Sequence, residues 1–91
     1  MYGSVNLKLG SCHITDNVKK VVSYNEVLGM LNRHANGDWG DICEDCAKKN
    51  NKAVKDGETV MSVYLTDNGS EVLIVTNADR SLTLVFLPCD A

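Results

Sequence analysis

The chain has 91 residues, of which 44% are hydrophobic and 23% are charged. This composition is typical of one small globular domain and excludes a disordered chain, so we expect a single domain over residues 1–91. Twelve Asp and Glu against nine Lys and Arg give a net charge of −3. An acidic chain lacks the basic surface that follows a phosphate backbone, which disfavours direct binding of nucleic acid.

Two further properties indicate the compartment. No stretch contains the roughly 18 consecutive apolar residues of a membrane span. The first residues, Met-Tyr-Gly-Ser-Val-Asn, lack the charged and apolar regions of a signal peptide. We therefore expect a cytoplasmic protein without membrane contact, in which the four cysteines are thiols or metal ligands and not disulfides.

The N-terminal part predicts one strand and one helical turn. Val5, Leu7 and Leu9 alternate with polar residues as far as Gly10-Ser11, which is typical of a strand. Over residues 14–22 the β-branched residues favour a strand, whereas the spacing of the valines favours a helix. We expect a helical turn here.

Two longer helices follow. Ser23-x-x-Glu26 is a capping box, which predicts a helix over residues 24–35 closed by Asn36-Gly37. Asp41-x-x-Glu44 predicts the N-terminal cap of a second helix, whose acidic start and lysine-rich later turns complement the helix dipole.

After Asp56-Gly57 the hydrophobic period changes to two. Apolar and β-branched runs separated by turn-forming residues span Val60–Thr66, Glu71–Thr76 and Leu82–Leu87. They predict an antiparallel β-meander that ends at Pro88. The expected fold is α+β, with two helices packed on a three- or four-stranded antiparallel sheet.

One face of the meander must point inward, and the pattern leaves open which. Met61, Val63 and Leu65 share a face of the first of these strands. Either Val72 and Ile74 or Leu73 and Val75 of the next strand accompany them.

Residues 34–41 are expected to form a fixed structural corner. Gly37 and Gly40 permit backbone conformations closed to other residues, and the only Trp, Trp39, requires a packed site at the end of the core. His34 is expected to hold the following loop in place.

Cys43-x-x-Cys46 has the spacing of zinc ligands, and other thiols and imidazoles could complete a tetrahedral set: Cys12, His13, His34 and Cys89. The signal is incomplete, because no second paired motif is present. Both cysteines also share a predicted helical face with Ala47, Asn50 and Val54, where a thiol behaves as a small hydrophobe. We therefore expect core thiols and no cofactor, with a structural zinc on Cys12, Cys43, Cys46 and Cys89 as the alternative.

Catalysis is disfavoured by the neighbours of each reactive side chain. Acidic residues around Cys43 oppose formation of a thiolate, which argues against a redox enzyme. His34 with Asp38 and Asp41 could serve as an acid–base group or an oxygen-rich metal site, but we favour both carboxylates as caps of backbone N–H groups. Several serines lack the neighbours that would make them nucleophiles: Ser4, Ser11, Ser62, Ser70 and Ser81. A single chain of this size is expected to lack a ligand cleft of roughly 300 Å³. We expect no enzyme activity.

A resemblance supplies a biological setting. The segments Leu31-Asn-Arg-His34-Ala-Asn-Gly37-Asp38-Trp39-Gly40-Asp41 and Thr76-Asn-Ala-Asp79-Arg80-Ser81-x-Thr83 resemble a family of short proteins carried by plasmids and prophages. Members of that family carry loose labels such as plasmid-related protein and often lack the second cysteine. The resemblance implies that any metal site here is particular to this chain.

The resemblance and the acidic balance together predict a non-catalytic binding protein of a mobile genetic element. Small acidic proteins of such elements commonly occupy a host protein, for example a CRISPR or restriction nuclease. The partner is expected to be a host or element-encoded protein. The expected contact residues are Asp38, Asp41, Glu44 and Asp45.

Overall fold

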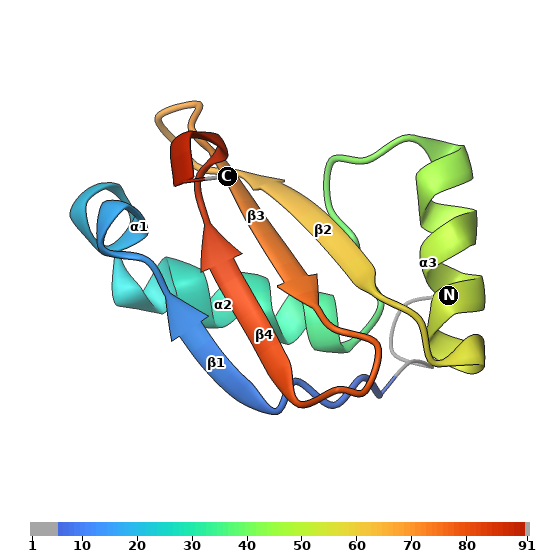
Figure 1. The fold of residues 1–91 in the computed structure, drawn as a ribbon. Coiled ribbons are helices and arrows are strands. Elements are labelled where there is room, and N and C mark those ends of the chain that lie inside the picture. The colour runs from blue at the N-terminus through green and yellow to red at the C-terminus, as the bar shows by residue number, and fades with distance from the viewer. Residues whose placement is uncertain (1–5, 91) are drawn as a thin grey trace.

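The structure is a computed structural model that describes residues 6–90 (Figure 1). The described part of the chain forms β1 (Ser11–Ile14), α1 (Asp16–Val21), α2 (Tyr24–Ala35), α3 (Glu44–Asp56), β2 (Val60–Leu65), β3 (Glu71–Thr76), β4 (Leu82–Phe86) and the short 3-10 helix η1 (Pro88–Asp90). The α+β class is therefore confirmed. None of the helices within residues 6–90 combines the length and the apolar character needed to cross a membrane.

The helices begin and end largely where the capping residues indicate. Thr15 caps α1, and Ser23 Oγ accepts from Glu26 N at 3.2 Å at the start of α2, which spans the predicted residues. The predicted cap of α3 is wrong, because Cys43 and not Asp41 occupies that position. Helix α3 begins at Glu44, so Asp41 lies two residues before the cap position, and its N–H donates instead to the Val63 carbonyl of β2 at 2.6 Å.

The first strand is displaced from its predicted place. Val5 lies outside the described residues, and Leu7 and Leu9 belong to no strand; β1 begins only at Ser11. Gly10 explains this start. It has a left-handed φ of 64°, and a side chain there would overlap the backbone of Ser81, so the chain passes the β3–β4 turn closely before pairing begins.

The sheet has the order β1-β4-β3-β2. Strands β2, β3 and β4 form the predicted antiparallel meander, but β1 pairs with β4 in parallel, so the sheet is mixed and the expectation of a purely antiparallel sheet is wrong. A parallel neighbour needs a long crossover. Here the chain between β1 and β4 supplies the helices and the other two strands (Figure 1).

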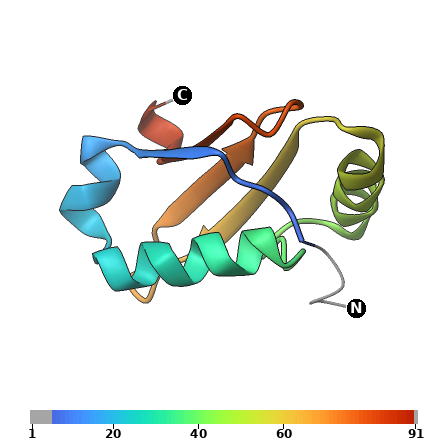
Figure 2. The ribbon, with the colours of Figure 1, turned by 90° about the horizontal axis from the view of Figure 1, so that it is seen from below.

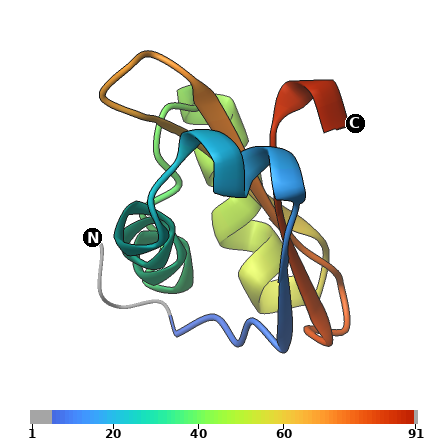
Figure 3. The same cartoon turned by 90° about the vertical axis from the view of Figure 1, so that its left-hand side faces the viewer.

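The helical layer covers one face of the sheet, which we call the inner face. Helix α2 runs beneath it, α1 closes the layer at the β1 side, and α3 stands beyond the β2 edge (Figures 2 and 3). The buried residues of the strands that point to the inner face are Val60, Ser62, Tyr64, Val72, Ile74, Thr76, Thr83 and Val85. Met61, Val63 and Leu65 therefore lie on the opposite, outer face.

Two hydrophobic clusters hold the inner layer. The larger one joins α1 and α2 to the sheet and includes Val18, Met30 and Ile74. The smaller one joins α3 to the start of β2 through Leu7, Trp39, Ala53 and Val60. Trp39 is only 4% exposed, so the expected packing of the indole at the end of the core is confirmed.

Candidate functional site

The corner between α2 and α3 is bonded to the β2 edge like an additional strand. Gly40 forms a parallel bridge with Val63, whose N–H donates to Trp39 O at 3.2 Å. Gly40 has a φ of 76°, and a Cβ there would overlap the Val63 carbonyl and the Tyr64 ring. Only glycine allows this approach, which explains the residue that follows the tryptophan.

The Trp39 ring is held on both sides. Its Nε1 donates to Asn51 Oδ1 of α3 at 3.0 Å, and the His34 ring lies against it edge to face with centroids 5.5 Å apart. The neighbouring Asn50 side chain donates to the Met61 carbonyl at 2.7 Å and accepts from the Met61 N–H at 3.3 Å. Helix α3 thus satisfies backbone hydrogen-bonding groups at the free edge of β2. The corner thus joins α2, α3 and β2.

Four buried side chains form a hydrogen-bonded chain across the inner face. His34 Nδ1 lies 2.5 Å from Ser62 Oγ, and His34 Nε2 lies 2.9 Å from Thr76 Oγ1. Thr76 Oγ1 is 2.7 Å from Thr83 Oγ1, whose hydroxyl donates to the Leu9 carbonyl at 2.7 Å. His34, Ser62, Thr76 and Thr83 have no exposed surface.

The Leu9 carbonyl at one end of this network determines which atom donates and which accepts in each of its hydrogen bonds. Because Leu9 O can only accept, the Thr83 hydroxyl donates to it and must accept from Thr76. The Thr76 oxygen then accepts from Nε2–H of His34, which leaves Nδ1 to accept from Ser62. Burial, with the positive charge of Arg80 as a smaller cause, lowers the pKa of His34 to about 4. The ring is therefore neutral at pH 7.

The contact of Ser62 with His34 corrects two sequence expectations. His34 binds strands β2 and β3, not the carboxylates or carbonyls of the loop that follows it. Ser62 does have an adjacent base, as a nucleophile would. Both groups are fully buried, however, and a substrate has no access to them in this structure. The pair therefore stabilises the core. The period-two pattern, which places Ser62 and Thr76 on the same buried face of the sheet, was the available signal.

The predicted acidic contact residues divide into two groups. Asp38 is held by Arg33, with Nε to Oδ2 at 2.7 Å and Nη2 to Oδ1 at 3.2 Å, and Oδ1 also accepts from Gly40 N at 3.2 Å. The hydrogen bond from Arg33 is the main reason why the pKa of Asp38 lies below its usual value. Arg33 also stacks over Tyr64, 4.7 Å from its centroid, so Asp38 is part of the corner.

The other three acidic residues, Asp41, Glu44 and Asp45, are exposed where the corner enters α3. Glu44 lies 3.7 Å from Lys48 in an exposed i,i+4 pair, which contributes roughly 0.3–0.5 kcal/mol at most. These three carboxylates remain at the surface beside the β2 edge, and we call them the acidic edge.

All four cysteines are exposed, so the expectation of core thiols is wrong. Helix α3 turns Asn50 and Ala53 inward, while Cys46 and the capping Cys43 face solvent. Cys43 Sγ accepts from Cys46 N at 3.3 Å and lies 2.9 Å from Cys46 Sγ. Within residues 6–90 no three His, Cys, Asp or Glu side chains are grouped to hold a metal ion, so Cys12 and Cys89 do not join this pair in a zinc set.

The hydrogen bond between the two thiols separates their acidities. The contact with the Cys46 thiol, which can donate to a deprotonated Cys43, lowers the pKa of Cys43, and the same contact raises the pKa of Cys46. The charge of Asp45 acts in the opposite direction on Cys43 but is a smaller cause. The sequence argument considered only the effect of acidic neighbours on the pKa of Cys43, which is smaller than the effect of the hydrogen bond with Cys46.

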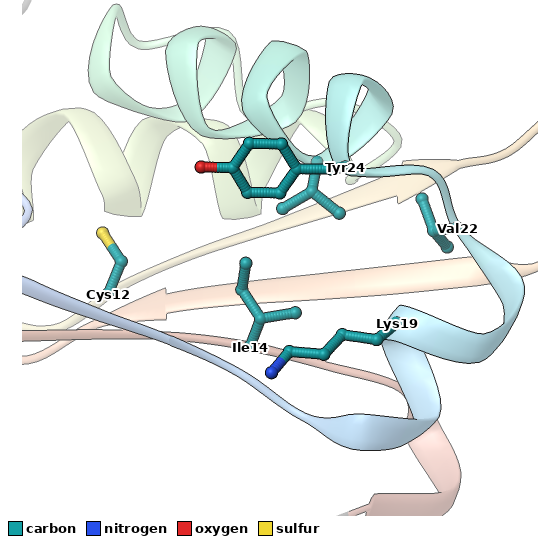
Figure 4. A pocket seen from close by; sticks show the side chains of 6 residues that line it. Cys12, Ile14, Lys19, Val22 and Tyr24 are labelled. Atoms are coloured by element: carbon teal, nitrogen blue, oxygen red, sulfur yellow. The ribbon is translucent and has the colours of Figure 1, made fainter.

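A pocket of about 460 Å³ opens between β1, α1 and α2 (Figure 4). This volume overturns the expectation that the single chain lacks a cleft. Ile14, Val22 and Val27 form apolar walls, and the polar groups are Cys12, the Lys19 amine and the exposed Tyr24. Within residues 6–90 no hydrogen bond joins these polar groups to one another, so the pocket contains no assembled nucleophile and base.

The sequence pattern did not determine which apolar residues of the meander lie on the outer face of the sheet. Its apolar residues, none of which is buried, are Met61, Val63, Leu65, Leu73, Val75, Leu82, Leu84 and Phe86. Strand register places Leu84, Val75 and Met61 in one row across three strands. Met61 is 44% exposed, Leu65 54% and Leu84 40%.

The second motif of the resemblance, Asn77–Ser81, also has an architectural role. Arg80 adopts a left-handed φ of 63° and donates to the carbonyls of Ala53 and Glu58 at 3.0 and 2.6 Å. It thereby fastens the β3–β4 turn to the end of α3. Asn77 and Asp79 accept from Ser81 N and close the turn.

Comparison with known proteins adds no functional assignment: no family model matches the chain, and no curated protein or solved structure matches it.

Proposed function

We propose that this chain is a non-catalytic protein-binding domain whose contact surface is the outer face of the sheet together with the acidic edge. The observation that carries the proposal is the uncovered apolar face. Eight apolar side chains lie on three adjacent strands with no helix of residues 6–90 above them except η1 near one end (Figures 2 and 3).

The size of this face supports an interaction surface. Three strands spaced about 4.8 Å apart, each running about 17 Å, give a flat footprint of roughly 250 Å² before side-chain relief is added. The largest apolar patch on a typical monomer is about 300–600 Å² and is often functional, and side-chain relief brings this face into that range. Among residues 6–90, the register places two ionisable residues beside these side chains, Glu71 opposite Leu65 and His13 of β1 opposite Leu84.

Continuity between the apolar face and the acidic edge favours a partner with a particular chemistry. A hollow of about 360 Å³ beside β2 is lined by Leu65 of the outer face and Asp41 of the acidic edge, with Arg33, Gly40 and Tyr64 between them. An apolar centre with a charged border is the usual anatomy of a protein interface. We therefore propose a partner that presents an apolar patch bordered by basic residues.

The biological setting of the proposal comes from the motif resemblance. A nuclease has basic residues around its nucleic-acid groove, so an acidic protein of a plasmid or phage can compete with the nucleic acid there. We propose that the domain acts in the cytoplasm as an inhibitor of a host defence nuclease of the CRISPR or restriction type.

A defence assay tests the proposal. Cells that carry a restriction or CRISPR system would express the chain, and the plating efficiency of a targeted phage would be measured. The wild-type chain should raise plating efficiency, and Leu84→Gln should abolish this effect. Asp41→Asn/Glu44→Gln/Asp45→Asn should reduce it, because the charge complementarity with the basic border is lost.

Leu28 provides the matched control. It is 44% exposed on α2, away from the outer face, so Leu28→Gln changes the same chemistry at similar exposure and should leave protection intact. Equal protection by Leu84→Gln and Leu28→Gln would overturn the proposal. So would a wild-type dimer in analytical ultracentrifugation that Leu84→Gln dissociates, because a second copy would then be the occupant of the face.

A further inference from the structure

Two contacting thiols on the surface of α3 lie outside the proposed binding function. Cys43 and Cys46 are exposed, their sulfur atoms are 2.9 Å apart, and Cys43 caps a helix of 13 residues. We propose that Cys43 and Cys46 form a thiol–disulfide exchange site, in which the pair reduces a small disulfide and becomes an intramolecular disulfide.

The geometry distinguishes the two thiols. Cys43 Sγ accepts a hydrogen bond from the Cys46 N–H, lies 2.9 Å from the Cys46 sulfur, and is at the positive end of α3. Once Cys43 has lost its proton, the Cys46 N–H and the Cys46 thiol can both donate to it. This stabilises the thiolate, in agreement with the lowered pKa of Cys43. Cys46 keeps its proton more firmly and stays within reach as the resolving thiol.

The exchange takes two steps. The Cys43 thiolate attacks one sulfur of a substrate disulfide, forms a mixed disulfide and expels the first substrate thiolate. Cys46 then loses its proton to water, attacks Cys43 Sγ and expels the second thiolate. Two electrons pass from the cysteine pair to the substrate, which leaves as two thiols after protonation.

The charges nearby select among disulfides. Asp41, Glu44 and Asp45 are exposed around Cys43, whereas Lys49 acts on Cys46. Carboxylates at the attacking sulfur disfavour an anionic disulfide. The substrate class is therefore a small neutral or cationic disulfide. The reaction rate should decrease from cystamine to hydroxyethyl disulfide to glutathione disulfide, and added salt should reduce these differences.

The test uses mass spectrometry on the full-length chain. The double variant Cys12→Ser/Cys89→Ser leaves only the two proposed cysteines. Hydroxyethyl disulfide should convert it to a product that has lost two hydrogens and carries no adduct. A further Cys46→Ser change should trap the mixed disulfide on Cys43, because the resolving thiol is missing.

Serine at position 43 keeps a good helix cap, so Cys43→Ser is expected to fold, and circular dichroism would verify this. In that variant Cys46 should react several-fold more slowly than Cys43 does in the Cys46→Ser variant. The inference is overturned if the double variant accumulates stable adducts on both thiols without losing two hydrogens. It is also overturned if Cys43 in Cys46→Ser reacts no faster than Cys12 in Cys43→Ser/Cys46→Ser.

Discussion

The inner face of the sheet buries hydroxyl groups and an imidazole, whereas the outer face exposes Met61, Leu65 and Leu84 and leaves its other apolar side chains half-buried. On the inner face every polar group has a partner, since no buried side-chain N or O atom of residues 6–90 lacks a hydrogen bond. None of the helices α1, α2 and α3 lies over the outer face (Figure 3).

This contrast separates residues that maintain the fold from residues available to a partner. Ser62 and Thr76 are tolerated inside because His34 satisfies both of them, so their polarity does not indicate catalysis. Leu84 and Met61 gain nothing from solvent, so their exposure indicates an interaction. Substitutions on the two faces should therefore have opposite consequences for stability and for binding.

The largest effect should come from removing the centre of the inner network. His34→Leu leaves the Ser62 hydroxyl and the Thr76 oxygen without their buried partner, at a cost of roughly 4 kcal/mol in unfolding free energy. Urea denaturation at pH 7 would measure this. Adding Ser62→Ala should recover about 1 kcal/mol by removing one orphaned group. A single variant within about 1 kcal/mol of wild type would show that the network contributes little.

The corner that connects the two faces should be nearly as sensitive. Gly40→Ala combines a left-handed backbone with overlap at Val63 and Tyr64, and should cost about 3 kcal/mol. Gly57 is the matched control, because it has a φ of 71° but open space around its Cα. Gly57→Ala should therefore cost only about 1 kcal/mol. If Gly40→Ala and Gly57→Ala lose equal stability, backbone strain accounts for the whole loss, and the close approach of Gly40 to β2 contributes nothing.

Acid should weaken the inner face before it affects the carboxylates. The pKa of His34 is about 4 in the folded chain against 6.5 for an ordinary histidine, so the unfolded chain binds more protons between these values. The His34 contribution is complete above pH 6.5 and is lost as the pH falls, by about 2 kcal/mol at pH 5. Asp38, Asp79 and Asp90 have lowered pKa values, so their contributions are lost only at still lower pH.

Urea denaturation between pH 7 and pH 5 would measure this loss. The same series on His34→Gln provides the control, because His13 and all the carboxylates remain in both proteins. The difference in slope between the two proteins then belongs to His34. A wild-type free energy of unfolding that stays constant over this interval would contradict the assignment of a neutral buried ring.

Local signals in the sequence predicted the helices and the meander, whereas long-range contacts decided the rest. The Ser23 capping box and the change of period after Gly57 are complete within a few residues, which is why α2 and the C-terminal strands were predictable. The parallel pairing of β1 with β4 depends on Gly10 meeting Ser81, 71 positions away in the chain. Hydrophobic periodicity reflects neighbours that are close in the sequence, so it does not predict a contact between such distant residues.

The candidate site shows the same limit. Sequence spacing placed Cys43 and Cys46 on one helical face but did not determine which face of α3 would meet the core. Trp39 and Asn50 decided that orientation by contacts with α3 and β2. The inward face of the meander was open for a similar reason, since both alternating sets contain mainly apolar residues and only the position of His34 makes Ser62 a core residue.

The smallest effect, and the sharpest comparison of the two faces, should come from two neighbours on β4. Leu84 is 40% exposed on the outer face, whereas Val85 is fully buried on the inner face. Leu84→Ala should change the unfolding free energy by no more than about 0.5 kcal/mol, whereas Val85→Ala should cost about 2 kcal/mol through lost packing. The larger residue on the outer face thus contributes less to folding than the smaller one beside it. A cost above about 2 kcal/mol for Leu84→Ala would mean that the outer face stabilises the monomer, and its exposure would then no longer indicate a partner.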